Sequence, residues 1–245
     1  MIMKPIKIFI TSWFRPDFTY RVIREIKDRT KTPHEIHVLD NGSNEETVEM
    51  LLGMFRWGTI QSLSLNSRNT GCLYGKIVFH AMTEEDDDFY VVTDNDIIPP
   101  RLSPDWLEQM LEIMRKHPDI GVLAQQMPPV WLQAPYAYED NVAFCQAVGN
   151  TFKVVRRKAF PALPQRMESY GDDAEACKEM AAKGWKSAFA RNIFCYNLEL
   201  DQPDWGYAKE QLAQDPRKAG YGPPFKYVPT NWDTLRPPED LVGKP

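Results

Sequence analysis

Two aspartates with one residue between them, Asp94 and Asp96, follow the apolar run Phe89–Val92. This aromatic and β-branched run predicts a buried strand that carries the two acids to the edge of a sheet. Because side chains alternate along a strand, we expect both carboxylates on the same face. Carboxylate oxygens suit a hard divalent cation such as Mg²⁺ or Mn²⁺, which often takes substrate phosphates as further ligands. The tripeptide therefore predicts a metal site, with capping of a following helix as the alternative role of the acids.

Strand and helix patterns alternate through the first hundred residues. The predicted strands are Ile6–Thr11, Glu35–Leu39, Ile60–Leu65 and Phe89–Thr93. This alternation predicts an α/β fold with a Rossmann-like, mostly parallel sheet flanked by helices. Ligands of such sheets bind outside the carboxyl ends of the strands. Four polar residues lie at or just after these ends: Thr11, Asp40, Arg68 and Asp94. One ligand can therefore contact all of them.

The overall composition excludes some classes of partner. The chain has 245 residues, a formal net charge of −5 and a pI of about 5.5. It therefore has no global basic field that would attract nucleic acid or an anionic membrane. A local basic cluster has near-helical spacing and predicts the solvated face of a helix. Its members are Arg21, Arg24, Lys27, Arg29 and Lys31.

The cysteines and the hydropathy pattern indicate a compartment. The four cysteines are far apart and form no Cys-x-x-Cys pair, so a zinc site is not expected. Reduced thiols are typical of intracellular proteins. The first residues, Met1–Pro5, have no signal-peptide pattern, and no apolar run approaches the ~20 residues that span a bilayer. We expect a cytoplasmic protein without a transmembrane segment.

Five short segments follow one another along residues 6–200. They are Ile8–Thr11 with Arg15-Pro16, His37–Ser43, Arg68–Lys76, Val91–Asp96 and Tyr170–Cys177. In this order they resemble the motifs of the family 2 glycosyltransferases, which have the nucleotide-sugar-binding GT-A fold. Two features depart from the family. Pro161–Ser169 stands where a Gly-Gly-Phe-Asp-Glu stretch is common, and Asn197 lies near the place of a metal-binding histidine.

The resemblance implies an inverting, metal-dependent transfer of a hexosyl group from a nucleotide-diphosphate sugar to a hydroxyl. The acceptor would be a carbohydrate, lipid-linked or other hydroxyl compound, and a nucleic-acid acceptor is not indicated. Asp94 and Asp96 would hold Mn²⁺ or Mg²⁺ on the diphosphate. The implied donor-binding residues are Thr11, Arg15, Asp40, Asn41, Arg68, Asn69, Gly71, Lys76, Thr93, Asp94 and Asn95. Four of them also have ordinary structural roles open to them: capping for Asp40, a plain turn for Gly71, and a surface charge for Arg68 and Lys76.

The resemblance also implies a catalytic base. Asp173 begins a predicted helix that ends at Gly184, and it would remove the proton of the attacking hydroxyl. Asp172 is the competing base. Adjacent acids at a helix start are also favoured by the helix dipole alone.

We expect a single GT-A domain over residues 1–200. Its first half, 1–100, would bind the nucleotide sugar, and 101–200 would hold the acceptor and catalytic residues. Residues 201–245 contain 8 of the 20 prolines, and we expect this Pro- and aromatic-rich extension to pack on the same domain.

Two other functions would use a similar sequence. A nucleotidyltransferase acting on sugar phosphates would favour a glycine-rich phosphate loop near the N-terminus, but residues 11–17 contain no glycine. The second is a non-catalytic sugar or nucleotide-sugar-binding module, and the intact acids Asp94, Asp96 and Asp173 argue weakly against such a loss of catalysis.

Overall fold

The computed structural model describes residues 4–70, 79–126, 135–149, 152–160 and 172–198. By their contacts, residues 1–196 form one compact unit and residues 197–245 a second. The predicted extension 201–245 and the segment 161–169 lie outside the described residues, so the predicted domain boundaries stay a prediction. None of the helices in the described part combines the length and the apolarity that crossing a bilayer requires.

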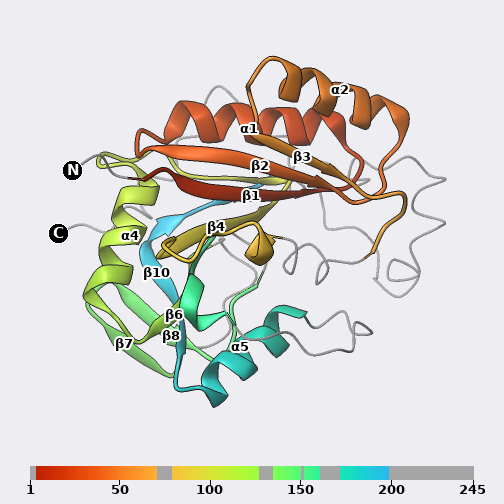
Figure 1. Ribbon diagram of the computed structural model, residues 1–245. Coiled ribbons are helices and arrows are strands. Elements are labelled where there is room, and N and C mark those ends of the chain that lie inside the picture. Colours follow the sequence, from red (N-terminus) through yellow and green to blue (C-terminus); the bar gives the residue numbers. More distant parts are fainter. Residues whose placement is uncertain (1–3, 71–78, 127–134, 150–151, 161–171, 199–245) are drawn as a thin grey trace, which may run out of the picture. The chain divides into compact units, whose positions relative to one another are not determined.

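A nine-stranded mixed sheet forms the centre of the first unit, in the order β3-β2-β1-β4-β9-β6-β10-β8-β7 (Figure 1). Its strands are β1 (Ile6–Ser12), β2 (His34–Asp40), β3 (Ser62–Leu65), β4 (Phe89–Asp94), β6 (Ile120–Gln126), β7 (Ala137–Glu139), β8 (Val142–Cys145), β9 (Lys153–Arg156) and β10 (Lys186–Phe194). Two short strands lie outside it, β5 (Ile97–Ile98) and β11 (Tyr196–Asn197). β1 to β4 are mutually parallel, as is the pair β6–β10, whereas β9 runs antiparallel between β4 and β6. The predicted α/β class with a mostly parallel sheet and flanking helices is confirmed.

The helices begin and end where local chemistry favours it. They are α1 (Pro16–Arg29), α2 (Glu45–Arg56), α4 (Trp106–Lys116), α5 (Asp172–Ala182) and the short 3₁₀ helix η1 (Arg157–Ala159). Asn44 caps α2, as predicted, because its side chain accepts a hydrogen bond from the Thr47 backbone N–H. Gly184 follows α5 with φ +85°, a conformation that glycine adopts without strain.

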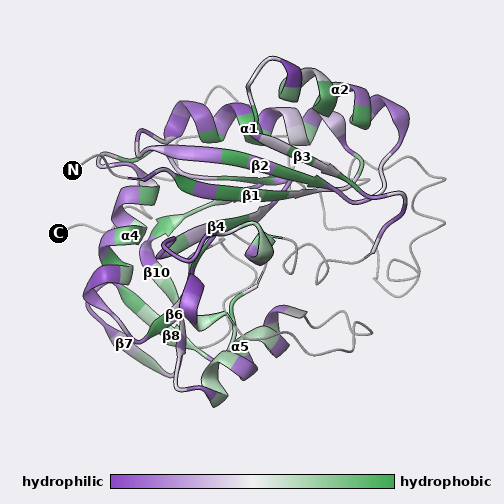
Figure 2. Ribbon diagram, in the orientation of Figure 1, coloured by the Kyte–Doolittle hydropathy of each residue, from purple (hydrophilic) through white to green (hydrophobic). Residues whose placement is uncertain are grey.

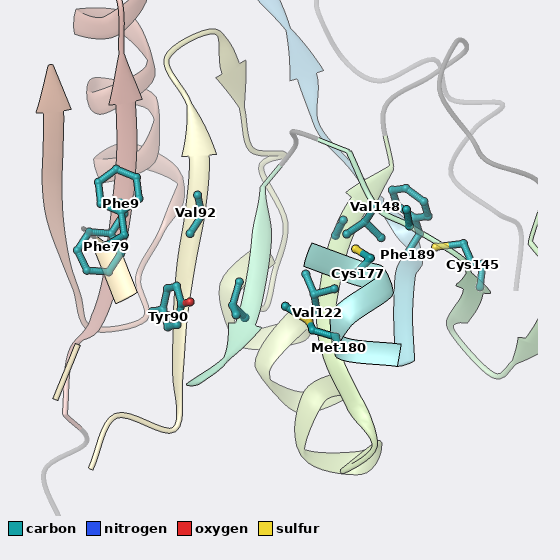
Figure 3. Close-up of a cluster of buried hydrophobic side chains, with 14 of the residues drawn as sticks. Phe9, Phe79, Tyr90, Val92, Val122, Cys145, Val148, Cys177, Met180 and Phe189 are labelled. Carbon is teal, nitrogen blue, oxygen red and sulfur yellow. The ribbon is translucent and has the colours of Figure 1, made fainter. Parts of the chain in front are cut away.

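The two faces of the sheet pack against different helices. α1 and α2 lie side by side on one face of the β1–β2–β3 part, and both alternate polar and apolar residues (Figures 1 and 2). On the other face, Phe9 and Val92 belong to a buried cluster that includes Cys177 and Met180 of α5 (Figure 3). We call this second face of the sheet the α5 face. Burial of this apolar area fixes which side chains of β1, β4 and β9 point toward α5.

Candidate active site

Three side chains reach the α5 face near the carboxyl ends of β1 and β4. Thr11 pairs with Asp94 between these two strands, and Lys153 of β9 pairs with Val92. Paired residues, and residues two apart on one strand, project to the same side. Because Val92 is part of the buried cluster on the α5 face, the side chains of Thr11, Asp94 and Lys153 project to this face too. The sheet thus brings together two predicted residues and a lysine that the sequence did not single out.

Asp173 joins this group from α5. Its Oδ1 lies 2.6 Å from Lys153 Nζ, and the side chains of Lys153 and Asp173 are 6% and 19% exposed. The two residues line a cavity of about 30 Å³ whose other walls are apolar, including Val92 and Met180. A nearly buried lysine in a central strand is uncommon without an acidic partner. This rule is the signal that identifies Lys153 as part of the site.

Asp96 does not lie on the strand face of Asp94. β4 ends at Asp94, and Asn95 and Asp96 form the turn into β5. The Asn95 amide donates hydrogen bonds to the Phe14 carbonyl and to Thr19 Oγ1, which turns the chain toward the β1–α1 loop. The prediction that both acids share one strand face is therefore wrong. Asn95, predicted to bind the donor, uses its amide to hold this turn.

Arg15 meets Asp96 from the β1–α1 loop. Its Nη1 lies 3.6 Å from Asp96 Oδ2, and both side chains are buried. Phe14 and Arg15 have φ angles of 53° and 57°, a left-handed conformation that costs energy in residues other than glycine. The Phe14 N–H donates to Ser43 Oγ at 2.7 Å, which helps to hold this strained loop. The loop thus places a cation beside the second acid of the tripeptide.

Asp40 is fully buried and engaged in its own turn. Its carboxylate accepts hydrogen bonds from the Gly42 and Ser43 backbone N–H groups and from Ser43 Oγ. Burial raises the pKa of Asp40, and the bonds from Ser43 and Gly42 oppose this shift. In register Asp40 pairs with Ser12, so it projects to the opposite side from Thr11. This geometry supports the alternative role of Asp40, an acid that closes the turn after a strand.

The loop after β2 is joined to the loop after β3. Asn41 accepts a hydrogen bond from the Thr70 backbone N–H and donates one to Asn69 Oδ1. A Cβ atom on Gly42 would lie 2.4 Å from the Arg68 carbonyl carbon, so only glycine allows this approach. Arg68 and Asn69 themselves are exposed. Two of the predicted donor-binding segments are therefore held together at the carboxyl edge of the sheet.

The remaining predicted site residues either point away from the α5 face or lie outside the described part of the chain. Thr93 is 1% exposed and, as the neighbour of Asp94 in β4, projects to the opposite face. Asp172 begins α5, but its side chain lies outside the description. Gly71 and Lys76 also lie outside the described residues.

The chain matches the family model of glycosyl transferase family 2 over residues 7–163. Since the match covers more than half of the 245 residues, the chain belongs to this family, as the five motifs predicted. No curated protein matches the chain.

Solved structures of glycosyltransferases share the fold. GalNAc-T7 with UDP, GalNAc and Mn²⁺ has a TM-score of 0.61 at 11% identity, covering 79% of this chain and 43% of that one. The mannosyltransferase PcManGT from Pyrobaculum calidifontis, in complex with GDP-Man and Mn²⁺, has a TM-score of 0.61 at 13% identity, covering 79% and 56%. S. aureus TarS 1–349 in complex with UDP-GlcNAc has a TM-score of 0.53 at 14% identity, covering 79% and 59%. The chain spans about half the length of these proteins.

Proposed function

We propose that this chain is an inverting glycosyltransferase that moves a hexosyl group from a nucleotide-diphosphate sugar to an acceptor hydroxyl. The observation that carries the proposal is the convergence of Thr11, Asp94, Lys153 and Asp173 on the α5 face. This edge is where α/β sheets bind ligands. Family membership and the nucleotide sugars bound by the similar structures support a donor of this class.

Asp94 and Asp96 are the proposed ligands of a divalent cation. Within the described residues, no three His, Cys, Asp or Glu side chains form a group that could hold a metal ion. Mg²⁺ and Mn²⁺ bound to phosphorylated substrates need only one or two carboxylates, because phosphate oxygens and water complete the shell. Two carboxylates are therefore enough in number for a cation shared with a diphosphate. Such a cation would take up charge that develops on the leaving group.

Arg15 places a positive charge beside Asp96, in addition to that of the proposed cation. Its guanidinium faces Asp96, a proposed ligand of the cation on the diphosphate, so we assign it to the diphosphate end of the donor. Planar guanidinium groups bind phosphate oxygens with two parallel hydrogen bonds. The ion pair with Asp96 keeps Arg15 in position before a donor binds.

Asp173 is the proposed catalytic base. The acceptor O–H would pass its proton to the Asp173 carboxylate while the oxygen bonds to the anomeric carbon. The bond from that carbon to the diphosphate breaks, and its electron pair leaves with the nucleoside diphosphate. A single displacement inverts the anomeric configuration. The ion pair with Lys153 holds Asp173 beside the cavity that both residues line.

Release of nucleoside diphosphate from UDP- and GDP-sugars in the presence of Mn²⁺ tests the proposal directly. We expect release that depends on an added hydroxyl acceptor and stops with EDTA, with inverted anomeric configuration in the product. Release of pyrophosphate from a nucleoside triphosphate and a sugar phosphate would instead identify a nucleotidyltransferase. Donor binding with no turnover on any acceptor would favour the binding module.

We also propose that the protein works in a reducing compartment, the cytoplasm. The described cysteines Cys145, Cys177 and Cys195 are buried free thiols, and burial raises the pKa of Cys145 and Cys195 to about 12. Thiols of this kind are inert and support a reducing compartment, in agreement with the cytoplasmic location predicted above.

A further inference from the structure

Two exposed aromatic side chains stand at the end of α2. Trp57, the residue that follows the helix, is 88% exposed, and Phe55 is 46% exposed. Tryptophan is normally among the more buried residues, because its large apolar surface favours removal from water. Phe55 and Trp57 are two residues apart, so their rings project to different sides of this helix end. A strongly exposed tryptophan with a second exposed ring at the same helix end is typical of sites that bind a partner or a membrane.

Three exposed basic side chains lie on α1 and in the last turn of α2. Arg24 and Lys27 are three residues apart on α1 and share one face of the helix, and Arg56 lies between the two aromatics in sequence. Lys27 Nζ contacts the Thr59 carbonyl at 3.4 Å, which joins the α1 face to the loop after α2. α1 and α2 lie side by side there (Figure 1). We call Arg24, Lys27, Phe55, Arg56 and Trp57 the basic–aromatic patch.

The charge of the basic–aromatic patch is not neutralised nearby. Among the described residues, Arg24, Lys27 and Arg56 form no salt bridge, although Arg24 donates to the Tyr20 hydroxyl. The nearest acids of α1 have other partners, since Glu25 pairs with Arg29 and Asp28 with Arg101. The patch is therefore a positive area on a chain whose net charge is −5.

We propose that the basic–aromatic patch docks the protein on an anionic lipid bilayer. Tryptophan and phenylalanine rings insert at the boundary of headgroups and acyl chains, and arginine and lysine are attracted to anionic headgroups. Stable docking needs both the aromatic rings and the basic side chains, because the chain as a whole has a net charge of −5 and is repelled by an anionic surface. The patch lies in the carboxyl-terminal halves of α1 and α2 and at Trp57, so it is toward the amino ends of the parallel strands, away from Asp94 and Asp173. Docking there leaves the candidate active site open to the aqueous phase.

Co-sedimentation of the full chain with vesicles tests this inference. At low ionic strength we expect binding to mixed phosphatidylcholine–phosphatidylglycerol vesicles and much weaker binding to phosphatidylcholine alone. Binding should fall as salt is added, because exposed charges are screened. Failure of the unmodified chain to bind the mixed vesicles would overturn the proposal, as would equal binding to both vesicle types.

Matched variants assign the binding to the basic–aromatic patch. Trp57→Ala should lower vesicle binding by about tenfold through the loss of apolar contact. Lys27→Glu should lower it by at least about fivefold through the loss of one cation near the membrane. The controls Tyr138→Ala and Lys183→Glu change an exposed aromatic and an exposed lysine elsewhere, and they should bind as the unmodified chain does.

Two further readouts separate membrane docking from a catalytic role of the patch and from self-association. Turnover on a soluble acceptor should be the same in the patch variants as in the unmodified chain, so a failure of the proposed enzyme activity does not affect this test. If the patch is instead an interface between two copies, Trp57→Ala will convert a dimer to a monomer in size-exclusion chromatography and leave vesicle binding unchanged. Equal losses of vesicle binding in the control variants would also refute the assignment to the patch.

Discussion

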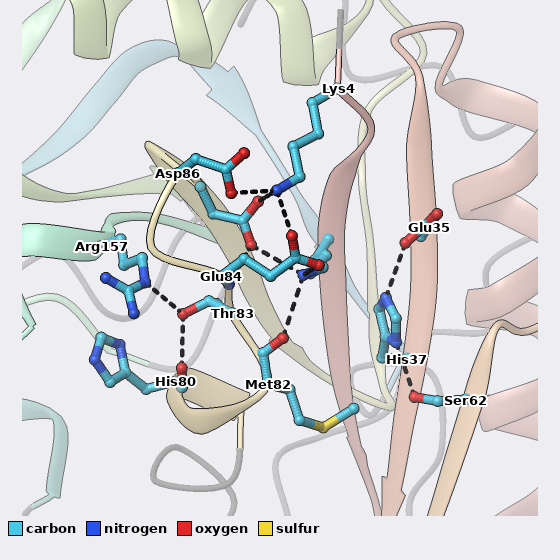
Figure 4. Close-up of polar contacts among 12 residues, drawn as sticks. Lys4, Glu35, His37, Ser62, His80, Met82, Thr83, Glu84, Asp86 and Arg157 are labelled. Carbon is cyan, nitrogen blue, oxygen red and sulfur yellow. Dashed lines mark hydrogen bonds and ion pairs between the residues drawn. The ribbon is translucent and has the colours of Figure 1, made fainter.

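The two ends of β1 and β4 carry charged residues in different arrangements. At the amino end, Lys4 and Lys7 meet Glu84, Asp86 and Asp87 from the segment that leads into β4, at 2.7 to 3.3 Å. Figure 4 shows the contacts of Lys4 with Glu84 and Asp86. Lys7 also donates to the Met82 carbonyl. This network joins two short, continuous segments, and each charge contacts at least one of opposite sign.

The carboxyl end is assembled from many separate elements. Arg15 and Asp96 come from two different turns, and Lys153 and Asp173 come from β9 and α5. Strained backbone at Arg15 and a cavity beside Asp173 accompany these ion pairs, and neither feature helps to stabilise the fold. Ion pairs alone thus do not distinguish a functional site from a structural network. The strain and the open space next to the pairs do.

The largest expected effect is at the two acids of the tripeptide. We expect Asp94→Asn combined with Asp96→Asn to lower turnover by more than about 10⁴-fold, because the proposed cation on the diphosphate would be lost. Thermal shift should show that Mn²⁺ with the donor no longer stabilises this variant. A protein that binds its ligand gains about 2.7 kcal/mol in unfolding free energy when the ligand concentration is 100 times the dissociation constant. Full turnover in this variant, or in the unmodified chain after EDTA treatment, would refute the metal assignment.

Asp173→Asn should lower turnover by about 10²–10⁴-fold, the usual contribution of a general base. Donor binding should survive, because Asp173 is proposed to act on the acceptor and not on the diphosphate. Asp172→Asn is the matched control, with a smaller expected loss. If Asp172→Asn proves the more harmful substitution in steady-state assays, the two roles are exchanged. Retention of anomeric configuration in the product would exclude the single displacement.

Lys153→Met tests whether the lysine positions the base. Its Nζ lies 2.6 Å from Asp173 Oδ1, and a base displaced by about 1 Å can cost about 10²-fold in rate. We expect kcat to fall by up to this amount with the donor KM unchanged. Lys153→Arg should restore part of the rate. A loss of thermal stability with an unchanged kcat would mean that Lys153 is only structural.

The sequence predicts the parallel half of the fold well because its signals are local. Strands β1, β2 and β4 were predicted within one residue at each end, and the Asn44 cap of α2 is confirmed. Hydrophobic runs and capping residues act over a few neighbours, so one sequence suffices to identify them. Membership of family 2 is likewise carried by short motifs.

The assembly of the site could not be predicted in the same way. Lys153 reaches Asp173 only because β9 inserts antiparallel beside β4, and no local pattern encodes that strand order. Asp96 leaves the strand because of hydrogen bonds from Asn95 to residues more than seventy positions away. Contacts at long sequence separation thus explain why the sequence did not identify Lys153 and why the predicted strand face of Asp96 was wrong.

At the amino end we expect an effect on stability alone. Burial would raise the pKa of Asp87, but hydrogen bonds from the Lys4 and Lys7 ammonium groups and from the Glu84 backbone N–H lower it to about 2. A carboxylate with a lowered pKa stabilises the fold above its unfolded pKa, and this contribution disappears as the pH falls from about 4 to about 2. Asp87→Asn should therefore destabilise the chain at neutral pH by about 2 kcal/mol in urea unfolding, with turnover of the folded enzyme unchanged. Near pH 2 the variant and the unmodified chain should converge.

Lys4→Met gives the smallest effect and sharpens the contrast between Lys4 and Lys7. Lys4 contacts the exposed acids Glu84 and Asp86 and also Asp87, but its own side chain is 39% exposed, whereas that of Lys7 is 10% exposed. Water and salt screen the exposed pairs, so removing Lys4 should cost less than removing Lys7. In urea unfolding the loss for Lys4→Met should shrink as salt is added, whereas the loss for Lys7→Met should persist. A loss for Lys4→Met that exceeds that of Lys7→Met would mean that the exposed pairs, and not the buried pair of Lys7 with Asp87, hold this end of the sheet.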